Sequence, residues 1–149
     1  MFRHLLLFFH LSAAVAWIGG MFFAYFCLRP AAAETLQPPQ RLPLWVETFA
    51  RFLPYMAIGV TVLAISGVGL FVPVGFQRAP AGWHIMLALG IVMVAVFIYV
   101  WLALFPQLRA QAAASAWPAA GQVLNRIRQM VALNLALGVC VIAAAVSGR

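Results

Sequence analysis

The sequence is poor in charge, and poorest in acidic residues. Only two of its 149 residues are acidic, and charged residues make up 7% of the chain, against roughly 25% in a soluble domain. Lysine is absent, so the formal net charge of +7 comes from nine arginines. Hydrophobic residues make up 66% of the chain, and its mean hydropathy is +1.05. This composition is that of an integral membrane protein, whose solvent is lipid.

These absences exclude several classes of function. The arginines form no basic run and are scattered between apolar segments, which is typical of membrane topology rather than of nucleic-acid binding. The apolar segments contain no acid, which argues against a proton relay of carboxylates. There is no P-loop, thiol pair or Ser-His-Asp pattern. Any redox chemistry would therefore require a cofactor.

The two cysteines are placed far apart in depth. Cys27 falls at the far end of the first apolar stretch, and Cys140 falls inside the last one. Their expected depths differ by about 20 Å, so we predict no disulfide and interpret each as a small buried apolar residue. The first apolar stretch is too long for the core of a signal peptide, and Arg29-Pro30 follows it in place of a small-residue cleavage site. We expect this stretch to be retained.

Four apolar stretches are long enough to cross a bilayer, which takes about 20 residues as a helix. They lie near residues 2–28, 52–72, 82–105 and 126–146. We expect Arg29-Pro30 to end the first helix, and Pro106 to begin the longest connection, residues 106–125. The sequence thus predicts an all-α fold, an up-down four-helix transmembrane bundle, with residues 1–149 as a single domain.

Arginine placement predicts the orientation of this bundle. Four spans put both termini on one side of the membrane. Six arginines are expected in the first and third connections, and three at the termini and in the second connection. Because cytoplasmic loops are enriched in arginine, we expect the termini to lie on the outer side.

Two histidines form the strongest candidate site. His10 lies inside the first span and His84 in the first turn of the third, so both are expected near the same membrane surface. Spans one and three would face each other diagonally, an arrangement suited to haem b with two axial imidazoles. Trp17, on the same helix face as His10, would pack against the macrocycle, and Arg3 and Arg78 would hold its propionates.

Two alternatives remain open at this stage. Imidazole and thioether groups are copper ligands, so His84, Met86 and His10 would bind Cu(I) and pass it to Met21, Met93 or Met130. Alternatively, the protein is a cofactor-free subunit or assembly factor of a larger membrane complex. It would then pack through the small residues Ser12, Ala16, Gly20 and Ala24.

His10 is a functional candidate by default, because ionisable residues inside a span are rare, but other candidate residues also have a simpler structural interpretation. His4 and His84 would be interfacial side chains, Trp17 a packing residue, and the methionines gap-filling core residues.

Three segments carry a resemblance to a known family. They are HLSAAVAWIGGMFFAYFCLRP at residues 10–30, WHIMLALG at 83–90, and AWPAAGQVLNRIRQMVALNLALG at 116–138. With them the chain resembles the CopD-like family of small bacterial membrane proteins, named for a copper-resistance protein of the inner membrane. The resemblance implies the bacterial inner membrane, and with the arginine pattern it predicts periplasmic termini.

A more distant resemblance is to the HemJ-type protoporphyrinogen oxidases. These are also four-helix proteins with a first-helix His-x6-Trp and a third-helix histidine, and they imply haem b on His10 and His84. The chain departs from their pattern at Met86, where a lysine is expected, and at Tyr25-Phe26, where a Pro-Arg pair is expected. The departures put oxidase activity in doubt. The leading expectation is a haem b protein of membrane electron transfer, with a redox partner or quinone and possible homo-oligomers.

Overall fold

The computed structural model describes residues 1–147, and every regular element within them is helical. Four long helices follow one another, and all four are long and apolar enough to cross a membrane. The chain is therefore a multi-pass membrane protein with the predicted all-α fold. The helical elements are α1 (Phe2–Phe22), a π-helical segment (Phe23–Leu28), α2 (Arg29–Thr35), α3 (Pro38–Phe71), a 3-10 helix (Phe76–Arg78), α4 (Ala81–Tyr99), a second π-helical segment (Val100–Leu104), α5 (Phe105–Ala113) and α6 (Trp117–Ser147).

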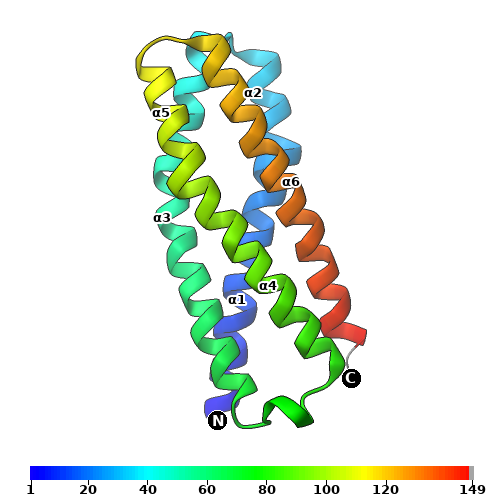
Figure 1. The fold of residues 1–149 in the computed structure, drawn as a ribbon. Helices are drawn as coiled ribbons and strands as arrows, with labels where there is room; N and C mark the ends of the chain where they lie inside the picture. The colour runs from blue at the N-terminus through cyan, green and yellow to red at the C-terminus, as the bar shows by residue number, and fades with distance from the viewer. Residues whose placement is uncertain (148–149) are drawn as a thin grey trace.

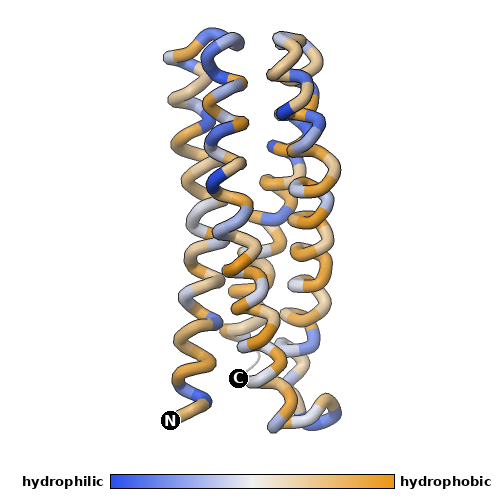
Figure 2. Tube along the Cα trace, turned by 90° about the vertical axis from the view of Figure 1, so that its left-hand side faces the viewer, coloured by the Kyte–Doolittle hydropathy of each residue, from blue (hydrophilic) through white to orange (hydrophobic). Residues whose placement is uncertain are grey.

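The helices pair into two hairpins that pack side by side (Figures 1 and 2). In the first hairpin α1 packs along α3, and in the second α4 and α5 pack along α6. The hairpins meet where α6 contacts α1 and α3, and where α5 contacts α3. Helices α1 and α4 both begin at the same end of the bundle, which we call the terminus end (Figure 1). The opposite end carries α2, α5 and the beginning of α6, and we call it the arginine end.

The helices are longer than the hydrocarbon layer is thick. Phe2–Thr35 and Pro38–Phe71 each form a helical unit of 34 residues. At 1.5 Å per residue such a unit is about 50 Å long, whereas the hydrocarbon core of a bilayer is about 30 Å thick. Hydrophilic residues are concentrated at the arginine end (Figure 2). We therefore place the additional helical length mainly at that end, at the level of the lipid headgroups and in water.

The expectation that Arg29-Pro30 ends the first helix is wrong, and so is the expectation of a break at Pro106. In both helices a π-helical segment stops two residues before the proline, at Leu28 and at Leu104. Each proline then lies at the start of the next α-helical segment, where the missing N–H and the fixed φ angle are tolerated. The change of hydrogen-bond pattern thus lets the chain continue as a helix through a residue that normally interrupts one.

The connections at the arginine end are accordingly shorter than predicted. The polar segment 31–42 forms most of α2 and the first turn of α3, and the expected loop 106–125 shrinks to Ala114–Ala116. Tertiary packing explains the added helix, because Leu42, Leu104, Leu108 and Ile127 are the largest fully buried side chains and all lie toward this end. At the terminus end, the turn between α3 and α4 uses Gly75 at φ 81°, a conformation that favours glycine.

Small residues bring α1 and α3 close together. A Cβ added at Gly20 would lie 2.6 Å from the ring of Phe52, and one added at Gly69 would lie 2.9 Å from Leu6. Within the predicted line of small residues, Gly20 packs against α3. Ser12 and Ala16 of the same line are exposed on the outside of the bundle. The cysteines need a correction as well. They are free, as predicted, but both are exposed rather than buried.

Candidate functional site

The fold brings the helices that carry the histidines to the same end of the bundle. His10 lies in α1 and His84 in the first turn of α4, and both helices begin at the terminus end (Figure 1). This agreement concerns the helices only. The surroundings of each imidazole decide whether the two side chains form one site.

His10 faces the neighbouring helix α3. Its Nδ1 lies 3.0 Å from the hydroxyl oxygen of Ser66, which is buried and itself donates to the backbone carbonyl of Val62. The imidazole also lies against the backbone of α3 at Gly67, where an added Cβ would be 3.2 Å from Cε1. The serine and the glycine hold one edge of the ring against α3. A histidine that is oriented through Nδ1 can present Nε2 to a metal.

His84 is engaged by the backbone of its own turn. Its Nε2 lies 3.0 Å from the carbonyl oxygen of Phe76, and its Nδ1 lies 3.2 Å from that of Pro80. The rings of Phe71 and Phe76 stand edge-on to the imidazole, with centroids 5.7 and 4.5 Å away. Because carbonyl oxygens accept hydrogen bonds, both ring nitrogens are directed at acceptors within the protein. The side chain therefore acts as a clamp on the turn between α3 and α4.

These surroundings do not fit a haem held between two histidines. An axial imidazole must direct an unprotonated nitrogen at the iron. In His84 both nitrogens face backbone carbonyls, and His10 makes its polar contact with an adjacent helix rather than across the bundle. The contacts of the two imidazoles therefore do not form the predicted pair of axial ligands. Haem b stays a prediction, and no chemistry is derived from it below.

The other predicted site residues are dispersed. Trp17 is buried, and its ring meets Phe97 of α4 edge-on at a centroid distance of 6.0 Å. Arg3 and Arg78 are exposed at the terminus end, as is His4, and Met86 is half-buried in α4. Among residues 1–147, no cluster of three or more His, Cys, Asp or Glu side chains has the spacing of a metal site.

A small, partly open cavity between the helices is lined in part by methionine. It measures about 30 Å³ and is lined by Met21 and Met130, with Trp17 and Asn134 in its wall. Asn134 donates from Nδ2 to the carbonyl oxygen of Met93 at 3.1 Å, while its buried Oδ1 has no hydrogen-bond partner within the described residues. A cavity of this size has room for one ion or one water molecule. Two thioether side chains and Asn134, whose Oδ1 is unpartnered, thus line one small space, and its remaining walls are aromatic or aliphatic side chains.

Sequence reasoning only partly anticipated this cavity. Met21 and Met130 were considered as copper ligands, but Asn134 on α6 was not. Met21 follows His10 by eleven residues, which is three helical turns, so the two share a face of α1. That spacing is visible in the sequence. The approach of α6, which brings Met130 and Asn134 to the same face, depends on how the two hairpins pack.

Comparison with known proteins identifies the family. Residues 46–147 match the family described as CopD, copper resistance protein D, and this range covers α4, α5, α6 and most of α3. Neither the curated proteins nor the solved structures gave a match to the chain. The match includes His84, Asn134 and Met130, whereas α1 with His10 lies outside it. It gives no support to the more distant likeness to the HemJ-type oxidases. Because the matched range is more than half of the chain, the protein belongs to the CopD family of membrane proteins.

Proposed function

We propose that this protein handles copper ions within the membrane, accepting Cu(I) as cargo in the interior of its helical bundle. The observation that carries the proposal is the small cavity lined by Met21, Met130 and Asn134, the last with an unpartnered Oδ1. Thioether sulfur is a soft ligand that favours Cu(I) over the hard cations. The family description, copper resistance protein D, supports the same metal.

His10 is the proposed entry ligand on the path to this cavity. It lies about 16 Å from the level of Met21 along α1, on the same helix face, at a rise of 1.5 Å per residue. Its Nδ1 contact with Ser66 fixes the ring against α3 and leaves Nε2 as the nitrogen for a metal. His84, whose two nitrogens face backbone carbonyls, has no part in the proposed path.

The proposal includes an orientation in the bacterial inner membrane, with the terminus end in the periplasm. The arginine end carries Arg29, Arg41, Arg109, Arg126 and Arg128, whereas the described part of the terminus end carries Arg3 and Arg78. This excess of arginine at one end supports a cytoplasmic location for that end. An amino-terminal alkaline phosphatase fusion should then be active, and an inactive fusion would reverse the orientation. Copper would enter at His10 from the periplasmic side.

Copper titration of the purified full chain tests the proposal. Cu(I) is added to the reduced protein in competition with a chromophoric Cu(I) chelator. We expect one tightly bound ion per chain. The variants Met21→Leu and Met130→Leu keep the side-chain volume but remove the sulfur, so each should weaken binding at least tenfold. Met56→Leu is the matched control, because Met56 is buried in the same core but does not line the cavity.

The outcomes separate the alternatives. Retention of copper by the Met21→Leu, Met130→Leu double variant would overturn the proposed site. An absorbance spectrum of the same sample tests haem b. A Soret band with the intensity of one haem per chain would favour the haem b hypothesis over the copper proposal. A protein that binds neither and co-purifies with a partner would be the cofactor-free subunit instead.

A further inference from the structure

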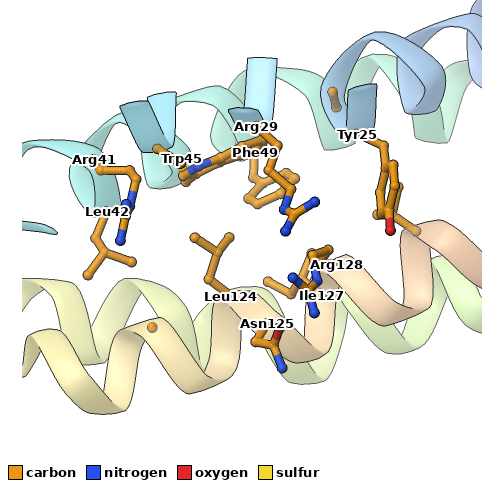
Figure 3. Close-up of a pocket in the computed structure, with 14 residues that line it drawn as sticks. Tyr25, Arg29, Arg41, Leu42, Trp45, Phe49, Leu124, Asn125, Ile127 and Arg128 are labelled. Carbon is orange, nitrogen blue, oxygen red and sulfur yellow. The ribbon is translucent and has the colours of Figure 1, made fainter. Parts of the chain in front are cut away.

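A second and larger cavity lies at the arginine end, between the two hairpins (Figure 3). It measures about 270 Å³, and its walls come from the end of the first helix, from α3 and from α6. Three arginines line it, namely Arg29, Arg41 and Arg128, and all three are half-buried. No acidic residue lines the cavity. Neither of the sites considered above uses this space.

The arginines reach the cavity from different helices. Arg29 and Arg128 come from opposite walls of the cavity and line its middle part, whereas Arg41, from the first turns of α3, lies toward one end of it (Figure 3). The Cζ atom of Arg29 lies 5.5 Å from the ring centroid of Tyr25, which holds this guanidinium beside an aromatic face. Like charges that converge in a partly desolvated space repel one another. A bound anion would reverse that cost.

The chemistry of the walls indicates what kind of anion fits. A guanidinium presents paired N–H donors that match the oxygens of a phosphate group. Next to the arginines the walls are apolar or aromatic, with Trp45, Phe49, Leu124 and Ile127. The additional helical length at this end places the cavity at the level of the lipid headgroups. A ligand with a phosphate group and an apolar portion would satisfy both parts of the wall.

We propose that this cavity binds a phosphate group, with Arg29 and Arg128 holding the phosphate from opposite sides and Arg41 adding a third positive charge. Two sources share this chemistry, the headgroup of an anionic membrane lipid and a free phosphate in solution. Binding closes the space between the two hairpins, because the two arginines belong to different hairpins. This site does not depend on the copper proposal.

Lipid binding to the purified full chain tests the site. Phosphatidylglycerol, phosphatidylcholine and inorganic phosphate are each titrated onto the delipidated protein, and the bound species are counted by native mass spectrometry. Arg128→Gln should weaken the binding of phosphatidylglycerol about tenfold or more, since a charge-assisted hydrogen bond is lost. Arg126→Gln is the matched control. It removes the same charge two residues earlier on α6, from an exposed side chain outside the cavity.

The outcomes decide both the site and the source. Selective binding of phosphatidylglycerol that Arg128→Gln weakens and Arg126→Gln does not weaken supports a lipid headgroup. Binding of inorganic phosphate with the same variant pattern supports a free phosphate. Equal losses in both variants, or no preference for phosphatidylglycerol or phosphate over phosphatidylcholine, would overturn the proposal. Arg128→Lys keeps the charge but not the paired donors, and a properly folded Arg128→Lys protein with unchanged affinity would also count against it.

Discussion

The two ends of the bundle use their polar side chains in opposite ways. At the terminus end, His10 contacts Ser66 and His84 contacts two backbone carbonyls, so both imidazoles are engaged within the protein. At the arginine end, Arg29, Arg41 and Arg128 line a cavity that contains no acidic partner. The sequence drew attention to the histidines because ionisable residues inside a span are rare. The larger of the two cavities described above lies at the other end.

The ends also differ in how their helices are held together. The largest fully buried side chains, Leu42, Leu104, Leu108 and Ile127, lie toward the arginine end, which resembles the core of a soluble helical bundle. At the terminus end large apolar side chains such as Phe2, Phe8 and Ile85 are exposed on the bundle surface. Lipid covers such side chains in a membrane, so burial there is supplied by the solvent. Helix packing at this end relies on close approach at small residues and on polar contacts.

Truncation in the core of the arginine end should have the largest effect on stability. Leu108→Ala deletes a fully buried side chain, and we expect the free energy of unfolding in detergent to fall by about 2–5 kcal/mol because a cavity remains. Leu44→Ala, at an exposed position of α3 near the same end, is the control and should change stability little. A similar loss of unfolding free energy in the two variants would show that the buried core does not account for the stability of the arginine end.

A larger side chain at the contact between α1 and α3 should have an intermediate effect. Gly20→Leu places its first side-chain carbon within 2.6 Å of the Phe52 ring, so overpacking should cost about 1–3 kcal/mol. The adjacent Gly19 has no atom within 4 Å of an added Cβ, which makes Gly19→Leu the matched control. Thermal unfolding of both variants measures the difference. Equal stability would contradict the close packing of the first hairpin.

Loss of the histidine clamp at the terminus end should have the smallest effect. His84→Leu removes the contacts with the carbonyls of Phe76 and Pro80, and we expect a loss of about 1 kcal/mol, typical of a hydrogen bond. Copper affinity should not change, because the proposed path does not use His84. His4→Leu, at an exposed histidine of the same end, is the control. A fall in copper affinity in His84→Leu alone would restore His84 as a ligand.

Much of the fold is predictable from the sequence, but its connections are not. Four apolar stretches and sparse charge determine four membrane helices, since lipid admits a backbone only when its hydrogen bonds are satisfied internally. Pro30 and Pro106 were interpreted as helix ends because proline lacks an N–H and restricts its neighbour. The π-helical segments that precede them remove that conflict, and no local pattern distinguishes such a proline from one that stops a helix.

The candidate site was predictable only as a set of residue types. His10, Met21 and Trp17 share a helix face by spacing alone, and that part follows from the 3.6-residue period of the helix. The role of His84 depends on the turn between α3 and α4, whose carbonyls occupy both of its nitrogens. Asn134 of α6 bonds a neighbouring helix by donating to the carbonyl oxygen of Met93. The carbonyl oxygen of its side chain, Oδ1, is a candidate ligand only because Asn134 lines the small cavity, and the sequence does not show that cavity.

The sequence by itself determined the class of this protein, its four helices and its family, because hydrophobicity and local motifs are properties of contiguous residues. Tertiary structure decided which side chains share a space. Arg29 and Arg128 are 99 positions apart in the chain. They meet across one cavity only because the two hairpins pack with α6 beside the end of the first helix. Such a meeting depends on helix packing, which no periodicity within a single helix encodes.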